Sequence, residues 1–575
     1  MKPLYISAII ITAGLFIPEG ISQTISQNYI SSETVLISGQ TSEAGIPGLS
    51  YQSKRTRIEY FDGLGRPSQV NYYKASPGGT MDLITSFGYD QYGRQEKSYL
   101  PFAAANNNMA FHSAPAAAVN WTAWYGSPDN SYAYSQLKYE ASPLNRIIKE
   151  SSPGNTWRME GGREVKTGYD SNVTGEVMNY TIGASNVINL TATAYPANTL
   201  VKTTLWDENN AQGSGTRTVE FRDKEDRVVL KRSYDAANAF STYYVYNTKG
   251  QLGCVIPPRA TADDGSISSS ELDQLCYQYI YDERERMIEK KLPGAGWEYL
   301  IYDSRDRLVL SQDARLRSVN PNRYHYTLYD GLNRPKEEGL CTETAGYSSL
   351  RSAVKASTGY TPSARDALVY FYYDRNSTTT STWGYPYTSV YSQHIQVDNV
   401  KEQITGIRAR MAGTGSTWLF TVNYYDKYGR LLQQYQTNLE GGYNRVSMAY
   451  DFEGKITDKQ TLHKKTSGGT GITLYENFTY DHMGRLTAVK SGYNTTTLTT
   501  LASNTYDDIG RLVLRKQHNN QQNINYTYNV RGWLTRINNP DAGSSASQLF
   551  AMSLYYDTDM SSVLNGPVQY NGNII

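Results

Sequence analysis

The sequence has 575 residues and a formal net charge of +1 at pH 7, from 55 Lys and Arg against 54 Asp and Glu. Proteins that hold nucleic acid through its phosphates carry a basic excess, so this balance predicts that nucleic acid is not a partner. The 51 Tyr against 12 Phe indicate a β-rich protein with shallow cores, because Tyr favours strands and its hydroxyl tolerates a half-buried surface.

The first 22 residues have the pattern of a secretory signal peptide. Lys2 precedes an apolar stretch, residues 4–17, that is too short to cross a bilayer of about 30 Å as a helix. Gly20 and Ser22 are small residues suited to a cleavage site. We therefore expect residues 1–22 to be removed and the mature chain to be secreted or on the cell surface, with export as its only relation to a membrane. A buried N-terminal strand or helix is the alternative.

We predict cleavage between Ser22 and Gln23, because the apolar stretch ends at a helix breaker that small residues follow. The intact mass of the secreted protein checks this. A secreted chain that still carries Met1 would contradict it.

A short phrase recurs along the rest of the chain, after a polar N-terminal segment at residues 23–56. It consists of an aromatic residue, Asp, two variable residues, Gly and Arg, and residues 61–66 are its first copy. We take the Asp, Gly and Arg of the five full copies as structural turn residues: Asp62, Gly65, Arg66, Asp90, Gly93, Arg94, Asp426, Gly429, Arg430, Asp481, Gly484, Arg485, Asp507, Gly510 and Arg511.

The phrase is typical of a β-hairpin. Its Asp can accept N–H bonds from residues further along the turn, and its Gly can take the positive φ that closes a type I turn with a G1 bulge. The aromatic residue and Arg flank the turn, so we expect each guanidinium to lie near a neighbouring ring. An Asp in such a turn lacks the closely spaced acidic partners of a calcium loop.

Degenerate copies fill the gaps between the full ones. Adjacent copies lie 21 to 30 residues apart, as from Asp282 to Asp303 and from Asp451 to Asp481. One hairpin cannot bury its own face, so neighbouring hairpins must stack to complete a core. The degenerate copies are Tyr169-Asp170, Phe221 to Arg227, Tyr246-Asn247, Tyr281-Asp282, Tyr302-Asp303, Tyr329-Asp330, Tyr450-Asp451 and, with its Arg and Gly in shifted order, Tyr528-Asn529.

These copies divide the chain after residue 56 into four parts. We expect a β-domain with degenerate repeats at 57–240, repeats at 241–344, an insertion at 345–420 and repeats at 421–575. Short helices are expected in the insertions, at residues 348–355 and after Ser268–Ser270, where Glu271 suits a capping box. The predicted fold is all-β, made of repetitive antiparallel hairpins.

The spaced Y-D-x-x-G-R phrases resemble the YD repeats of Rhs proteins, of the C components of Tc toxins and of teneurins, from about residue 57 to the end. Residues 139–146 and 566–574 resemble parts of Rhs-type proteins from Bacteroidetes-like bacteria. The resemblance implies a ribbon wound into a hollow shell that encloses a C-terminal toxin or effector polypeptide, a role in interbacterial competition. Rhs repeats end in a self-cleaving core and a variable effector. This sequence stops inside another apparent repeat, so it reads as a truncated N-terminal portion or an incomplete shell.

No pattern of enzyme chemistry stands out. The sequence lacks a G-x-S-x-G elbow, a P-loop and an H-E-x-x-H motif, so we expect no enzyme, no catalytic residues and no cofactor. We expect no metal site, since the His and Cys residues are scattered and Asp557-x-Asp559 is only a weak approach to calcium spacing. Cys254 and Cys276 could pair in an oxidising compartment, which would leave Cys341 unpaired.

Two functions follow from these observations. The first is a structural shell or cell-surface scaffold whose partner is a C-terminal toxin or effector, or another surface protein. The second is a carbohydrate-binding or adhesive module, for which Trp121 and Trp124 are the aromatic pair to consider, although an ordinary core or loop pair is favoured. The sequence downstream of Ile575 would discriminate between them.

Overall fold

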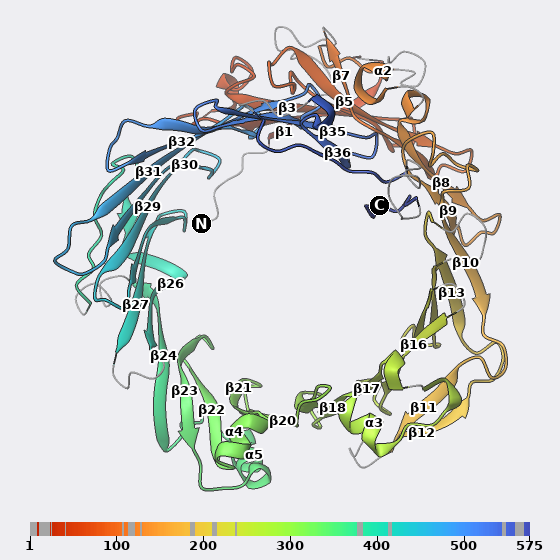
Figure 1. The fold of residues 1–575 in the computed structure, drawn as a ribbon, viewed down its shortest axis with the longest axis vertical. Coiled ribbons are helices and arrows are strands. Elements are labelled where there is room, and N and C mark those ends of the chain that lie inside the picture. Colours follow the sequence, from red (N-terminus) through yellow and green to blue (C-terminus); the bar gives the residue numbers. More distant parts are fainter. Residues whose placement is uncertain are drawn as a thin grey trace.

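One continuous antiparallel β-ribbon makes up almost the whole molecule (Figure 1). The structure is a computed structural model, and it describes residues 8–10, 24, 26–40, 42–105, 108–112, 121–126, 129–183, 190–209, 216–235, 238–260, 262–375, 383–411, 417–542, 548–557 and 568–574. In this part of the chain, 35 strands form one sheet and two more, β11 and β12, form a separate hairpin. The predicted all-β fold of repetitive hairpins is confirmed.

The ribbon begins near the N-terminus and passes through the first phrases without a break in the described strands. Strand β5 pairs with both β6 and β7, and from β8 onward the ribbon continues strand by strand, except that β10 pairs with β13 and β24 pairs with β26. The strands of this first part are β1 (Ala8–Ile10), β2 (Asn28–Val35), β3 (Lys54–Phe61), β4 (Pro67–Tyr72), β5 (Met81–Tyr89), β6 (Gln95–Tyr99), β7 (Phe102–Ala105), β8 (Tyr134–Tyr139), β9 (Ile147–Ser151), β10 (Val165–Ser171), β11 (Met178–Ile182), β12 (Leu190–Ala194), β13 (Val201–Trp206), β14 (Arg217–Arg222), β15 (Val228–Asp235), β16 (Asn238–Tyr246) and β17 (Leu252–Ile256).

The second part of the ribbon continues in the same way to β37. The region predicted as an insertion, 345–420, contributes strands β24 and β26 to the ribbon as well as a helix. The strands are β18 (Tyr277–Tyr281), β19 (Met287–Lys291), β20 (Glu298–Tyr302), β21 (Leu308–Gln312), β22 (Arg323–Tyr329), β23 (Pro335–Thr342), β24 (Ala364–Arg375), β25 (Gln396–Val397), β26 (Asn399–Arg410), β27 (Trp418–Asp426), β28 (Leu431–Thr437), β29 (Tyr443–Tyr450), β30 (Ile456–Lys464), β31 (Ile472–Tyr480), β32 (Leu486–Tyr493), β33 (Thr499–Tyr506), β34 (Leu512–Gln517), β35 (Gln522–Tyr528), β36 (Leu534–Ile537) and β37 (Met552–Ser553).

Short helices lie in the connections between strands. Helix α3 has the predicted capping box, with the Ser268 hydroxyl accepting from the N–H of Glu271, and α5 covers the predicted stretch 348–355. None of the described helices is long and apolar enough to cross a membrane. The helices are α2 (Thr122–Tyr125), α3 (Ser269–Gln274), α4 (Ala314–Val319), α5 (Tyr347–Lys355), and the 3-10 turns η1 (Glu43–Gly45), η2 (Asp129–Tyr132), η3 (Pro258–Ala260), η4 (Ala262–Asp264) and η5 (Pro540–Ala542).

The N-terminal signal prediction falls largely outside the described residues. Of residues 1–22, the structure describes only Ala8–Ile10, whose backbone pairs with residues 31–33 of β2 as strand β1. Removal of a signal peptide would take β1 away and leave β2 paired with β3 alone.

The ribbon curves into a ring, and its last strands return to its first ones (Figure 1). At the top of this view β35 and β36 overlap β1 and β3, and the C-terminal end of the described chain lies inside the ring. Contacts between residues some 400 positions apart join the two regions, among them the bond from Arg485 to the carbonyl of Ala75. The ribbon therefore overlaps itself, and we call this overlap the seam.

Buried clusters form where a connecting segment covers one face of the ribbon. Strand β3 alternates between buried and half-buried residues along its whole length, as a ribbon with one covered face requires. Hairpin β11–β12 packs through Tyr180 onto Tyr243 of β16, and α5 buries Leu350 and Val354 against β21 to β23. The core is therefore a series of small clusters along the ring, as the Tyr-rich composition indicates.

Candidate functional site

Each phrase forms a turn in which the Asp side chain bonds both the backbone and the Arg. At the first copy, Asp62 Oδ1 accepts the N–H groups of Leu64 at 2.9 Å and Arg66 at 3.0 Å. Its Oδ2 accepts from Arg66 Nε at 2.7 Å. The N–H of Gly65, at φ +77°, donates to the Asp62 carbonyl, which closes a type I turn followed by a bulge. The structure places the Asp, Gly and Arg of all five full copies in this arrangement.

Four degenerate copies form the same turn with another residue at the glycine position. Asp226, Glu285, Asp306 and Asn333 all stand there at φ between +61° and +66°. The prediction of a shifted copy at Tyr528-Asn529 is wrong. The N–H of Gly532 donates to the Asn529 carbonyl as in the other turns, and Trp533 occupies the Arg position. Asp170 lies within strand β10 and forms no such turn, since Asn172 caps the connection there instead.

The residue that starts the turn is matched to the residue that ends it. Wherever Arg or Lys ends a five-residue phrase turn, Asp starts it. Asn247 stands opposite Gln251, and Asn247 Nδ2 donates to Gln251 Oε1 at 2.8 Å. Asn529 likewise stands opposite the uncharged Trp533. The carboxylate is thus tied to a cation, and an amide replaces it where the cation is missing.

The Arg of each turn stacks on the Tyr of the next repeat, which is the neighbouring ring that the phrase predicts. The Arg66 guanidinium carbon lies 4.4 Å from the centre of the Tyr89 ring. The same contact recurs for Arg94 and Tyr139, Arg146 and Tyr169, Arg227 and Tyr246, Arg286 and Tyr302, Arg307 and Tyr329, Arg334 and Tyr373, Arg430 and Tyr450, Lys455 and Tyr480, Arg485 and Tyr506, and Arg511 and Tyr528.

The same Tyr bonds back to the preceding repeat. The Tyr89 hydroxyl donates to the carbonyl of Pro67, the residue after Arg66, at 2.7 Å. Tyrosines bond in this way from Tyr139 to Gln95, Tyr169 to Ile147, Tyr246 to Val228, Tyr281 to Leu252, Tyr329 to Leu308, Tyr373 to Pro335, Tyr450 to Leu431, Tyr480 to Ile456, Tyr506 to Leu486, Tyr528 to Leu512 and Tyr556 to Leu534. We call this chain of contacts the turn ladder.

Several Arg residues also reach the next turn directly. Arg334 holds both carboxylate oxygens of Asp374, at 2.9 and 2.7 Å, and Arg307 Nη1 donates to Asn333 Oδ1 at 3.1 Å. Such forked bonds fix orientation as well as distance. These partners could not be predicted from the sequence, because their spacing varies with the length of each repeat.

We predict that Val at Gly429, Gly484 or Gly510 destabilises the protein by about 1–2 kcal/mol or more, since a β-branched residue resists positive φ. The loss should be largest at Gly510, where an added Cβ would lie 3.2 Å from Arg485 Nη1. Gly331 is the control, because its φ is not positive and an added Cβ meets nothing within 4 Å. Thermal unfolding measures all four variants, and unchanged melting at the three turn glycines would contradict the hairpin interpretation.

The carboxyl groups of Asp62 and Glu140 are held as anions by their turn partners. The N–H of Arg66, followed by its side chain, lowers the pKa of Asp62. At the wider turn of residues 140–146, Arg146 and then Ser142 lower the pKa of Glu140 to about 2. A general acid at neutral pH needs a pKa shifted in the opposite direction.

The first half of the seam joins the turn at Asp481 to the loop after β4. His482 Nε2 lies 2.8 Å from the carbonyl oxygen of Lys74, and the His482 ring meets that of Tyr51 edge-on. Arg55 donates to the carbonyl of His482 and pairs with Glu453 at 3.4 Å. The late turn at residues 481–485 thus contacts the start of β3 and the loop after β4.

The second half of the seam is centred on Arg531. Its guanidinium carbon lies 4.2 Å from the centre of the Trp533 ring and 5.2 Å from that of Trp157. The guanidinium also donates to the carbonyl of Tyr570 and pairs with Glu208 at 3.2 Å. Trp157 is 1% exposed, and its Nε1 also donates to the Tyr570 carbonyl, at 2.8 Å. Trp157 lies outside the repeated phrase, and Trp533 stands where the phrase usually has Arg, so the periodicity did not indicate this contact.

We predict that acid weakens the seam through His482. Burial lowers its pKa, the Lys74 carbonyl and Asp481 raise it, and Arg485 and Arg55 lower it further. The pKa of His482 is thus lower in the folded protein than in the unfolded chain, where it is about 6.5. The contribution of His482 to folding stability is therefore present above pH 6.5 and is lost as the pH falls through the folded pKa. We expect His482→Gln to show a smaller fall in melting temperature between about pH 7.5 and 5.5 than the unmodified protein.

His394 is the control for this pH dependence, because burial also lowers its pKa and it bonds the N–H of Tyr450 away from the seam. Proteolysis near the seam should become easier at acidic pH in His394→Gln but not in His482→Gln. An unchanged pH profile in His482→Gln would contradict the prediction.

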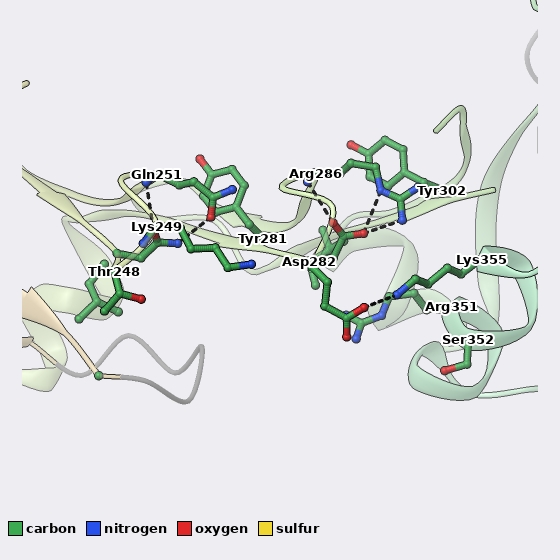
Figure 2. Close-up of a pocket in the computed structure, with 15 residues that line it drawn as sticks. Thr248, Lys249, Gln251, Tyr281, Asp282, Arg286, Tyr302, Arg351, Ser352 and Lys355 are labelled. Carbon is green, nitrogen blue, oxygen red and sulfur yellow. Dashed lines mark hydrogen bonds and ion pairs between the residues drawn. The ribbon is translucent and has the colours of Figure 1, made fainter. Parts of the chain in front are cut away.

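A surface pocket of about 420 Å³ lies where neighbouring turns meet helix α5 (Figure 2). Its walls include the turns 247–251 and 282–286 and the α5 residues Arg351, Ser352 and Lys355. Within it, Lys355 pairs with Glu283 at 2.7 Å, and Arg286 and Asp282 bond each other as in the other turns that start with Asp and end with Arg. The pocket is therefore bordered by ladder residues whose charges are already paired.

Other candidates from the sequence occupy structural positions. Trp121 is 5% exposed and packs with Phe102, and Trp124 packs against the same cluster from helix α2. Among the described residues no group of His, Cys, Asp or Glu is arranged to hold a metal ion. Asp559, and with it the Asp557-x-Asp559 pair, lies outside the described residues.

Comparisons with known proteins match parts of this chain. A domain of unknown function, DUF6443, matches residues 33–171. No curated protein matches the sequence. The crystal structure of TcdB2-TccC3 has 14% sequence identity and a TM-score of 0.41, over 88% of this chain and 24% of that one. The structure of TcdB2-TccC3-Cdc42 has 14% sequence identity and a TM-score of 0.40, over 88% of this chain and 24% of that one. The structure of TcdB2-TccC3-TEV has 13% identity and a TM-score of 0.40, over 92% of this chain and 27% of that one. This chain spans about a quarter of the solved chains that it matches.

Proposed function

We propose that this chain is a structural YD-repeat protein, secreted or on the cell surface, and part of a shell that encloses or displays a polypeptide such as a C-terminal toxin or effector. It has no catalytic role of its own in this proposal. The observation that carries it is the seam, because contacts between late turns and early loops close the ribbon into a ring (Figure 1).

The turn ladder supports a structural role for the repeated residues. An active site needs one singular arrangement of groups, with a neighbour that shifts a pKa or orients a nucleophile. Here the same Asp, Arg and Tyr contacts recur at turn after turn. In the first of these turns, Asp62 and Arg66 form an ion pair with each other. A contact that recurs in this way between neighbouring hairpins suits the wall of a shell.

A carbohydrate-binding or adhesive role has less support. The aromatic pair that the sequence suggested for it, Trp121 and Trp124, packs into a core cluster, and sugars stack on exposed rings. Glycan binding remains the alternative function for surfaces other than this pair.

Protease access tests the enclosure. We expect an unstructured peptide with a protease site, fused after Ile575, to be cleaved at least about ten times more slowly than the same peptide inserted between Glu440 and Gly441. The chain end lies inside the ring in Figure 1, whereas Glu440 is in an exposed hairpin turn between β28 and β29. Equal cleavage rates at the two positions would contradict enclosure of a polypeptide that follows the chain.

A further inference from the structure

Two buried cysteines lie together at a short joint of the ribbon. Cys254 is in β17, Cys276 directly precedes β18, and both are 0% exposed within one hydrophobic cluster. The β17–β18 ladder pairs Cys254 with Gln278, and residues two apart on a strand share a face, so Cys276 lies on the same face as Cys254. This ladder has only two residue pairs, against six between β13 and β14.

The segment between the two cysteines is anchored at its middle. Asp263 accepts hydrogen bonds from Arg232 and Tyr243, each at 2.7 Å, and from Ser241 at 2.7 Å. These bonds fix the segment to β15 and β16, and Gln278 donates to the carbonyl of Leu272 at its far end. The segment therefore presents Cys276 to Cys254 in a set position.

We propose that Cys254 and Cys276 form a disulfide when the protein meets a disulfide oxidant, and that this bond staples β17 to β18 in the wall of the ring. The structure holds them as free thiols, the state from which the bond forms. The proposal does not depend on the enclosed cargo, and oxidation after export would supply the oxidant.

The two thiols affect each other's ionisation. Their interaction raises the pKa of the Cys254 thiol and lowers that of the Cys276 thiol. The Cys276 thiolate attacks one sulfur of the oxidant and releases the other as a thiol. The Cys254 sulfur then attacks Cys276 in this mixed disulfide and releases the second sulfur of the oxidant as a thiol. Two protons and two electrons have then passed from the cysteines to the oxidant.

Burial sets when this reaction occurs. Neither sulfur is exposed, so exchange takes place before the segment closes or during its local opening. Cys341 is the internal control, since it is also buried but belongs to the cluster under α5, and burial raises its pKa to about 12.

The test is thiol counting on the purified full chain, equilibrated with oxidised and reduced glutathione, then denatured and alkylated. We expect one alkylated cysteine, Cys341, in the oxidised protein and three after reduction. A non-reducing digest should contain a peptide pair that joins Cys254 to Cys276. Cys341→Ser should leave that pair intact, and Cys254→Ser and Cys276→Ser should each abolish it.

Closing a loop of this length should raise the melting temperature of the oxidised protein by roughly 3 °C, and the rise should vanish in Cys254→Ser. The digest of the unmodified protein keeps the proposal falsifiable even if a Ser variant folds poorly. Three alkylated cysteines after oxidation, or a linked peptide that contains Cys341, would overturn it.

Discussion

Replacing Asp303 with Asn will lower the free energy of unfolding by about 3 kcal/mol, because a buried cation loses its partner. Asp303 is 0% exposed, and its Oδ2 accepts from Arg307 Nη2 at 2.6 Å and Nε at 2.8 Å. An Asn keeps the oxygen that caps the turn, but its NH₂ group then faces the N–H groups of Arg307. Equilibrium denaturation in urea measures the loss.

Two variants separate this ion pair from the turn itself. Asp303→Asn combined with Arg307→Gln copies the natural Asn247 and Gln251 pair, so it should lose less stability than the sum of the two single changes. Asp62→Asn is the more exposed control, expected to lose much less stability because water reaches Arg66 there. If Asp303→Asn unfolded like the unmodified protein, or if the two changes were simply additive, the matched-turn interpretation would be wrong.

Replacing Trp157 with Ala will cost about 3–5 kcal/mol and open the seam, because it removes a buried ring and its bond to Tyr570. We expect the region around residues 568–574 to become susceptible to proteases while the β-sheet signal in circular dichroism persists. The turn ladder does not pass through Trp157, so most of the ribbon should remain folded.

Trp157→Phe and Trp418→Ala are the matched controls for the seam. Phe keeps an aromatic ring but not the N–H, so it should cost less than Ala. Trp418, in β27, stacks with Arg408 away from the seam, so its loss should destabilise without exposing residues 568–574. Equal protease susceptibility in Trp157→Ala and Trp418→Ala would show that Trp157 has no special part in closing the ring.

Local features of this fold could be predicted because their chemistry lies within a few residues. The Asp, Gly and Arg of a phrase are in one turn, and the sequence therefore indicated the type I turn, the bulge at Gly65 and the hairpin period. The capping box at Ser268 follows from the same local logic. The cost of an Asp-to-Asn change could not be predicted from the sequence, because the forked bond from Arg to Oδ2 is visible only in the structure.

Contacts between distant residues could not be predicted in this way. Ring closure brings Arg485 to the Ala75 carbonyl and Arg531 to Glu208, and neither pair shares a period or a motif. The strands at 364–375 and 399–410 were expected to be part of an insertion because the phrase there is broken, yet Arg334 grips Asp374 and continues the ladder. Pairing with a neighbouring strand outweighs a missing motif.

Single-particle cryo-electron microscopy of the purified chain tests most directly whether the turn ladder builds a ring closed by the seam. The account predicts a closed ring in which the turns at 481–485 and 529–533 rest on the loops at residues 73–80 and 152–164. An open arc, with the first and last hairpins apart in solution, would contradict it.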